Sequence, residues 1–322
     1  MKKVLLILLV FIMGASILAA CSNKKDDTSK TEVKQEVSKF ETENKKLKNG
    51  TVVINKFKDY TIHTYASPED GALVNTQIIE TKNKLIVIDA QFLLPYAKEA
   101  RDYANSLKKP IERLIISHSH PDHWFGSELF SDTKIYALKE VKDEIEKTGD
   151  AKIKSKQAIN QAAPLVPTKL TAPTHILEEG NLIIDGLNMV VKKVTETEAE
   201  EIAMIEIPQD KVLIAQDVVY NASHIYLAQN ETDRNNWIKT LEELKGNNYS
   251  LVLGGHGVPT TNKVFSDMIQ YIKDGNEIIK KISSENKDNK EKAQEYKNYI
   301  IEKYPNYKGK DIVDLTTMFL FV

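Results

Sequence analysis

Short apolar runs separated by polar turns fill the stretch between residues 51 and 90, a pattern typical of β-strands. The segments 51–54, 60–65 and 73–79 are rich in β-branched residues and partly alternate between apolar and polar positions. The segment 85–89 is a continuous apolar run that ends in an aspartate, which predicts a strand buried on both faces. We therefore expect the folded part of the chain to begin with a sheet.

Helical and strand-like patterns alternate through the rest of the chain. Residues 94–107 have helical spacing, residues 232–245 predict a helix that stops at Gly246, and the chain after residue 263 is mostly helical. Further strands are predicted at 114–116, 134–137 (followed by a charged helix), 188–194, 202–207, 211–214 and 251–253. Strands interleaved with helices in this way predict a mixed α/β domain built in layers.

The first 20 residues predict a signal peptide. A short basic start precedes an apolar run that ends in small residues, which is the layout of a secretory signal. The single cysteine, Cys21, directly follows Leu18-Ala19-Ala20, and this sequence resembles the bacterial lipobox, whose cysteine is lipidated. The alternative is a transmembrane anchor, but the run is short for a span of ~20 residues. We expect a lipoprotein that is anchored through Cys21 to the outer face of the bacterial cytoplasmic membrane.

Composition divides the remaining chain into three parts. Residues 21–48 are rich in charged and small polar residues, which predicts a disordered tether. We expect the layered domain over residues 49–275 and a helical C-terminal extension over residues 276–322.

The formal net charge of −2 gives no indication of nucleic-acid binding. A single cysteine leaves no partner for a disulfide within the chain, so stability must come from the core.

Four candidate metal ligands are concentrated directly after a predicted buried strand, in the sequence His-Ser-His-Pro-Asp-His. Imidazole nitrogens and carboxylate oxygens are ligands for zinc and its neighbours in the first transition row. His118 and His120 are two residues apart, so in an extended segment both side chains point to one side. Asp122 and His123 follow a proline, where the chain turns, and can face a second position nearby. The alternative is a cluster at a helix start that binds no metal.

The pattern His-X-His-X-Asp-His resembles the signature of the metallo-β-lactamase superfamily. The resemblance extends over roughly residues 51–273 and implies an α/β fold, a four-layer αββα sandwich with a di-metal site at one edge of its two sheets. It implies two divalent metal ions, zinc by first choice with manganese or iron as alternatives. It also implies hydrolysis of a small-molecule substrate by a hydroxide that bridges the two metals, with Asp122 both binding metal and transferring a proton.

The same resemblance implies further ligands downstream. Asp217 follows a predicted strand and matches the bridging aspartate, although Gln216 stands where the family usually has glycine. His256 matches the last histidine, in a Gly-His-Gly turn. The remaining histidine is absent, and in its place Glu198 resembles the glutamate of the alkylsulfatase branch. The alternatives to Glu198 are Glu196, Glu200 and Glu201. One metal is then assigned to His118, His120 and Glu198, and the other to Asp122, His123 and His256, with Asp217 between them.

Several residues and functions stay open at this stage. Tyr220, His224 and Trp124 are candidates for the substrate pocket, although core packing explains Trp124 equally well. His63 and His175 are interpreted as structural. The expected activity is hydrolysis of an ester, a lactone, a sulfate ester or a related bond. The alternatives are a metal-binding surface lipoprotein that captures a ligand with little catalysis, and an interaction module without metal. The pattern does not indicate an oligomeric state.

Overall fold

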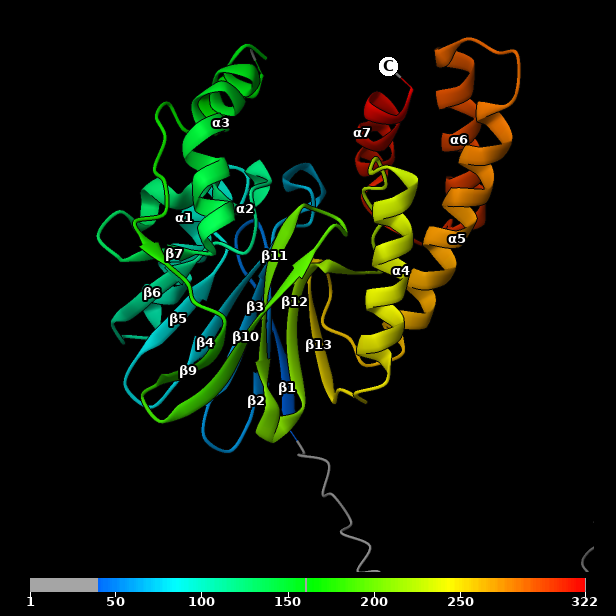
Figure 1. Ribbon diagram of the computed structural model, residues 1–322. Helices are drawn as coiled ribbons and strands as arrows, with labels where there is room; N and C mark the ends of the chain where they lie inside the picture. The colour runs from blue at the N-terminus through cyan, green and yellow to red at the C-terminus, as the bar shows by residue number, and fades with distance from the viewer. Residues whose placement is uncertain (1–39, 160, 322) are drawn as a thin grey trace, which may run out of the picture. The chain divides into compact units, whose positions relative to one another are not determined.

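Two β-sheets packed face to face, with helices outside them, make up the part of the chain that the computed structural model describes, residues 40–159 and 161–321 (Figure 1). The first sheet has the order β1-β2-β3-β4-β5-β6-β7-β8 and the second the order β13-β12-β11-β10-β9. The predicted α/β fold with four αββα layers and a helical C-terminal extension is therefore confirmed.

The strands of the first sheet are β1 (Glu41–Lys46), β2 (Thr51–Lys56), β3 (Thr61–Ala66), β4 (Asn75–Glu80), β5 (Leu85–Ile88), β6 (Ile111–Ile115), β7 (Ile135–Ala137) and β8 (His175–Ile176). Those of the second are β9 (Gly180–Ile184), β10 (Leu187–Thr195), β11 (Glu201–Ile207), β12 (Val212–Asn221) and β13 (Leu251–Gly257). The helices are α1 (Leu94–Ser106), α2 (Pro121–Trp124), α3 (Lys139–Gln157), α4 (Glu231–Lys245), α5 (Val264–Ser283), α6 (Asn289–Lys303) and α7 (Lys310–Leu320).

Parallel pairing explains why functional side chains gather at one edge of the sheets. β5 and β6 are parallel neighbours in the first sheet, and β12 and β13 are parallel neighbours in the second. Parallel strands end at the same edge, and their connections must cross the sheet as α1 and α4 do here. The predicted ligands therefore follow strands that end close to one another.

The apolar core is divided between two clusters of buried side chains. One combines the facing strands of both sheets with α1 and α3. The other lies between β11, β12 and β13 and the helices α4, α5 and α6, around Trp237 and Phe265. β12 contributes to both clusters, since all but its last residue are buried. This strand is consequently fixed on both faces, which gives Asp217 on it a rigid position.

The prediction of a disordered tether over residues 21–48 is wrong for 41–46, which form strand β1. Every residue of β1 is polar and exposed, so neither hydrophobicity nor a period of two marks it as a strand. The strand is held by an antiparallel ladder to β2 and by pairs such as Glu43 with Lys56, whose atoms lie 2.6 Å apart. Charged side chains on an edge strand also oppose pairing with other chains.

Other sequence predictions differ mainly at element boundaries. β9 was not predicted, and β12 is longer than its apolar segment 211–214. The predicted signal peptide, the lipidation site Cys21 and most of the tether lie outside the described residues. Within the described ranges, no helix is both long and apolar enough to cross a lipid bilayer.

The C-terminal helices are attached to the segment that follows β12. The backbone N–H of Leu227 donates to the Thr316 hydroxyl of α7 at 3.1 Å, and the N–H of His224 donates to the Lys308 carbonyl at 2.8 Å. Ile312, Val313 and Thr316 of α7 are buried. The extension is therefore packed onto the second sheet's helical layer.

Replacing Thr316 with valine tests this attachment. The substitution keeps the side-chain volume but leaves the buried N–H of Leu227 without an acceptor, which should lower the free energy of unfolding by about 1–3 kcal/mol. Denaturant unfolding is the measurement. Thr317→Val is the matched control, because within the described residues the Thr317 hydroxyl bonds only the Asp314 carbonyl of its own helix. Equal effects of the two substitutions would contradict the proposed attachment.

Candidate metal centre

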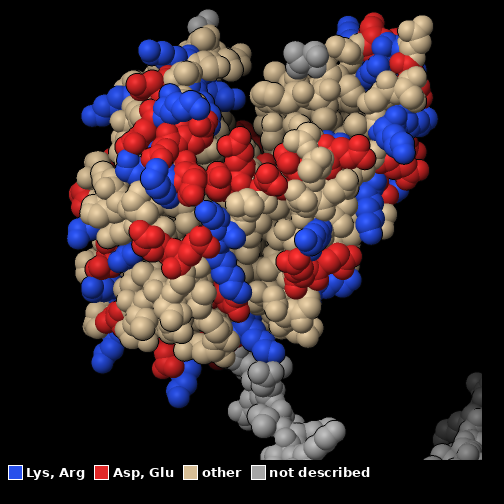
Figure 2. Space-filling model, in the orientation of Figure 1, with Lys and Arg blue, Asp and Glu red and all other residues tan. Residues whose placement is uncertain are grey.

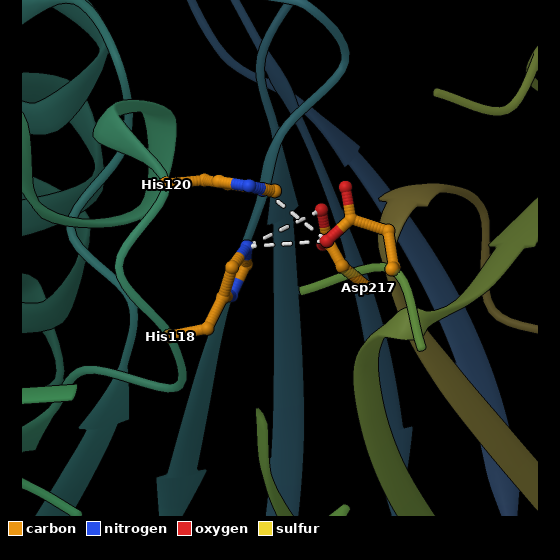
Figure 3. Close-up of side chains that lie close together, drawn as sticks. His118, His120 and Asp217 are labelled. Carbon is orange, nitrogen blue, oxygen red and sulfur yellow. Dashed lines mark ion pairs between the residues drawn. The ribbon is translucent and has the colours of Figure 1, made fainter. Parts of the chain in front are cut away.

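Seven candidate ligands from separate elements meet at the edge where β6, β12 and β13 end. His118 and His120 lie in the loop after β6, and α2 carries Asp122 and His123 one turn later. The second sheet supplies Asp217 from β12, His256 from β13 and Glu198 from the loop between β10 and β11. Figure 3 shows the two imidazoles of His118 and His120 reaching toward Asp217 from the opposite side.

The first group of ligands consists of His118, His120, Glu198 and Asp217, with every donor atom within 4.8 Å of the others. His120 Nδ1 lies 3.2 Å from Glu198 Oε2. His118 Nε2 lies 3.7 Å from the same oxygen and 3.6 Å from Asp217 Oδ2 (Figure 3). Of the four neighbouring glutamates considered from the sequence, Glu198 alone belongs to a ligand group of the described chain. It is buried, whereas Glu196 and Glu200 are exposed.

The second group consists of Asp122, His123, Asp217 and His256. His123 Nε2 lies 3.2 Å from Asp217 Oδ1, and His256 Nε2 lies 3.2 Å from Asp217 Oδ2. Asp122 Oδ2 lies 3.4 Å from both imidazole nitrogens. Asp217 is thus shared between the two groups and presents an oxygen to each.

These distances fit two divalent metal ions. Ligand atoms about 2.0–2.2 Å from a tetrahedral metal lie about 3.3–3.6 Å from one another, and the separations here run from 3.2 Å to 3.7 Å. Among the residues that the structure describes, four buried candidate-ligand atoms have no hydrogen-bond partner: His118 Nε2, His123 Nε2, Glu198 Oε2 and Asp217 Oδ1. Buried polar atoms without a partner are costly, and all four lie inside the two groups. The residues present therefore fit a centre of two metal ions.

Asp89 organises the ligands from behind, a role that the sequence did not reveal. Its carboxylate binds His123 Nδ1 at 2.7 Å and accepts from the Ser117 N–H at 2.8 Å and the Ser117 hydroxyl at 2.7 Å. The Ser117 hydroxyl is also within 2.9 Å of His118 Nδ1. The side chain of Gln216, the residue that departs from the family's glycine, donates to Asp89 as well. Such contacts fix the orientation of ligating imidazoles.

The backbone at this edge adopts unusual conformations. Asp89 has φ 63° and Gln216 has φ 45°, values in the left-handed region that side chains other than glycine rarely occupy. Both residues are fully buried, and their side chains bond each other. Asp89 contacts the ligand His123, and Gln216 directly precedes Asp217, so strain is retained where the candidate ligands are held.

Tyr220, predicted as a pocket residue, lies against the ligands themselves. Its hydroxyl is 2.9 Å from Asp217 Oδ2 and 3.4 Å from Glu198 Oε1. Its ring stacks on His256 with 4.6 Å between centroids and 6° between planes. Burial, together with the carboxylates of Asp217 and Glu198, raises the pKa of this hydroxyl well above its usual value. Tyr220 therefore remains a hydrogen-bond donor to the shared aspartate.

The pKa values of the candidate ligands are set by the opposite charges of their neighbours as well as by burial. Burial lowers the pKa of His256, but the Asp217 and Asp122 carboxylates outweigh it and raise that pKa to about 10. Burial raises the pKa of Asp217, but the imidazoles of His123 and His256 outweigh it and hold that pKa well below its usual value. Burial raises the pKa of Glu198 against the opposing effect of His120. Without metal, protons on His120, His123 and His256 balance the buried carboxylates, whereas burial keeps the pKa of His118 well below its usual value.

The other residues singled out from the sequence lie away from both ligand groups. His224 is buried and bonds the Tyr271 hydroxyl at 3.1 Å, beneath the C-terminal extension. Trp124 is a core residue whose indole N–H donates to the Ser119 carbonyl at 3.1 Å, which supports the ligand loop. His63 pairs with Glu80 at 3.0 Å, and His175 lies on β8. Sequence reasoning missed Tyr226, whose ring lies 5.9 Å from that of His120.

The sequence is similar to a known protein family and to a sulfatase. The family model of the metallo-beta-lactamase superfamily matches residues 70–256. Alkyl/aryl-sulfatase BDS1 of Saccharomyces cerevisiae is 27% identical over 229 residues, which are 59% of this chain and 35% of the yeast protein. The chain thus spans much less than two thirds of this relative, so the similarity covers only part of the sulfatase.

Two solved structures share the fold at low sequence identity. The sec-alkyl sulfatase PisA1 aligns with a TM-score of 0.54 and 17% identity, over 79% of this chain and 50% of the sulfatase chain. A metallo-beta-lactamase from Pontibacter korlensis aligns with a TM-score of 0.50 and 14% identity, over 73% of this chain and 99% of the lactamase chain.

Replacing Gly255 with alanine should damage the metal centre. A Cβ at this position would overlap with Asp217 Oδ1, so the shared carboxylate would have to move. We expect metal affinity to fall about 10- to 100-fold, measured by competition with a chromogenic chelator. Gly246→Ala is the control, because its Cβ would meet nothing closer than the Glu243 carbonyl at 3.4 Å. Unchanged affinity in Gly255→Ala would show that Asp217 does not bind metal from this position.

Proposed function

Because the chain belongs to the metallo-beta-lactamase superfamily, we propose that it is a hydrolase that uses two divalent metal ions to cleave an ester, a lactone, a sulfate ester or a related bond. The observation that carries this proposal is the pair of ligand groups that share Asp217, with unpartnered buried atoms facing the space inside each group. Zinc is the first choice of metal. Three carboxylates among seven ligands also suit manganese or iron.

The residues of the centre have separable roles in this proposal. Two bound divalent ions would supply Lewis acidity and lower the pKa of a water molecule. Asp122 is the only one of the three ligand carboxylates that reaches solvent, with 24% of its side chain exposed against 1% for Glu198 and Asp217. Its position lets it exchange a proton with a substrate at the open side of the centre. Tyr220 and Asp89 hold the ligands in place from behind.

Glu198 changes the charge of the centre relative to a histidine ligand. The carboxylate adds one negative charge, so three acidic ligands offset most of the charge of two divalent ions. A bound water would therefore be less acidified than at a centre with three histidines on this side. This proposal rests on the 3.2 Å approach of Glu198 to His120 and on the burial of the glutamate.

Metal content tests the ligand assignment. We expect about two ions per chain in the wild-type protein and about one in Glu198→Gln, measured by elemental mass spectrometry after desalting. Glu196→Gln is the matched control, since Glu196 is an exposed neighbour that bonds Asn236 instead. Equal metal content in all three proteins would remove Glu198 from the ligand set.

The same preparations test the reaction. Wild-type protein should hydrolyse at least one member of a panel of activated esters, lactones and sulfate esters, and chelation should abolish turnover. Bound metal without turnover on any member would favour the alternative, a surface protein that captures a ligand. Absence of bound metal in the wild-type protein would refute the proposed hydrolase.

We further propose that the protein is a lipoprotein attached through Cys21 to the outer face of the bacterial cytoplasmic membrane. The proposal rests on the basic start, the apolar run and the Leu-Ala-Ala-Cys sequence. Replacing Cys21 with alanine should prevent lipid attachment, so the mature acylated form should disappear from the membrane fraction. Metabolic labelling with palmitate measures this, and equal labelling of wild type and variant would refute the assignment.

A further inference from the structure

Helix α7 has an exposed apolar face that the proposed chemistry does not explain. Phe319 is 62% exposed, Met318 65% and Leu315 37%. Positions three and four residues apart lie on the same side of a helix, so these side chains form one surface. The other side of α7 is buried against the protein through Ile312 and Val313. Grouped exposed apolar residues mark a site of interaction more often than single ones do.

Aromatic rings connect this surface to the metal centre. The ring of Tyr226 lies 5.9 Å from that of His120, at 87°, and 6.2 Å from that of Phe319, at 86°. Tyr226 therefore touches a candidate ligand on one side and α7 on the other. In Figure 1, α7 and α3 stand on opposite sides above the ends of the strands, and Figure 2 shows a hollow between them. The wall of that hollow over α7 is largely uncharged (Figure 2).

The Tyr226 side chain is half-buried, so part of it remains open to a neighbouring molecule. Tyr226 therefore offers an apolar ring to a substrate chain and carries a hydroxyl group that can donate a hydrogen bond.

Cationic groups that would recognise an anionic substrate are engaged elsewhere. The sequence contains three arginines, and all lie in the described part of the chain. Arg101 pairs with Asp132 at 2.8 Å, and Arg113 lies over the Tyr136 ring at 4.2 Å. Arg234 is buried and bonds the Gln229 carbonyl and Asn276. No guanidinium is thus available at the centre for the bidentate contacts that sulfate and phosphate groups favour.

Nearby lysine is also engaged, and acidic groups surround the hollow. Lys152 of α3 donates to the Ser119 carbonyl at 3.0 Å, between the two ligand histidines. Acidic side chains gather below the hollow in Figure 2. These acidic groups, and the three carboxylate ligands that offset most of the charge of two divalent ions, favour an uncharged substrate over one that brings its own negative charge.

We propose that Tyr226 and the exposed face of α7 form a subsite for the apolar chain of an uncharged carboxylic ester, open-chain or cyclic, whose ester group reaches the metal centre. The inference rests on the proposed hydrolase function and narrows its substrate class. Water supplies a hydroxyl group to the acyl carbon and a proton to the leaving alcohol as the acyl C–O bond breaks, so no co-reactant is required. The rings of His120, Tyr226 and Phe319 form one continuous row from the metal centre to α7. This arrangement favours a substrate chain, which would reach both ends of the row, over a partner that contacts α7 alone.

The test is the dependence of hydrolysis on chain length. Turnover of 4-nitrophenyl acetate, butyrate, hexanoate and octanoate is compared between wild type and the double variant Met318→Ser, Phe319→Ser. A fully buried methylene corresponds to about fourfold in affinity, and a chain against a one-sided wall to about twofold. We expect kcat/KM to rise about twofold per methylene in wild type and to be nearly flat in the variant, so that the two proteins differ most on the octanoate ester. Ile183→Ser, on β9 and 67% exposed, is the matched control.

A binding measurement separates this inference from the proposed function. Calorimetric titration with N-octylacetamide, N-ethylacetamide and octane-1-sulfonate needs no turnover. Tighter binding of the octyl amide that is lost in the double variant supports the subsite even if no ester is hydrolysed. Ester turnover with equal chain-length dependence in wild type and variant overturns the subsite and leaves the hydrolase standing.

Three further outcomes would overturn the proposal. Binding of octane-1-sulfonate more than tenfold tighter than N-octylacetamide would show that the site selects anions. A second outcome is that wild type and double variant show equal chain-length dependence, but only the wild-type protein floats with phosphatidylcholine vesicles. That result would assign the face of α7 to a lipid surface instead. A change of oligomeric state in the double variant with the same equal dependence would assign it to a second copy of the chain.

Discussion

Burial of the Asp217 carboxylate where the two sheets meet is the constraint on which the rest of the centre depends. A negative charge excluded from water needs cations or donors on every side. The chain supplies His118 from the first sheet, His256 from the second and the Tyr220 hydroxyl from the same strand. Each of these groups can approach only because the strands that carry them end at one edge. The fold is therefore what allows the buried Asp217 carboxylate to be surrounded by the cations and donors that it needs.

The sequence predicted the strands that carry strong local signals and the candidate ligands that the structure brings together, and it failed where position depends on distant contacts. Continuous apolar runs identified β5, and the spacing around His118 identified the ligand loop, because both signals are contained within a few residues. β1 has no such signal, since its six polar residues are ordered only by pairing with β2. Asp89 was recognised as the end of a strand, but its contacts to residues 117, 123 and 216 exist only after folding. Tyr226 was missed for the same reason.

At two positions the sequence departs from the family pattern, and in both cases contacts in the structure accommodate the different side chain. Gln216 occupies a position usually held by glycine, and it keeps the left-handed backbone while its amide donates to Asp89. Glu198, which the resemblance to the family places where a histidine is usual, directs Oε2 toward His120 in the first candidate ligand group. The loop is fixed further by Gln229, whose amide donates to the Glu198 carbonyl at 2.7 Å. Each residue that differs from the family pattern is therefore held in place by hydrogen bonds with neighbouring side chains.

The order of elements along the chain has an evolutionary consequence. All seven candidate ligands lie between residues 118 and 256, whereas α7 begins at Lys310, after every one of them. A gene can therefore acquire substitutions in its last segment without altering a codon for any ligand. The α7 part of the proposed subsite and the candidate ligands are therefore inherited in separate stretches of DNA, so descendants of this protein could exchange one set of substrates for another while the reaction itself is conserved.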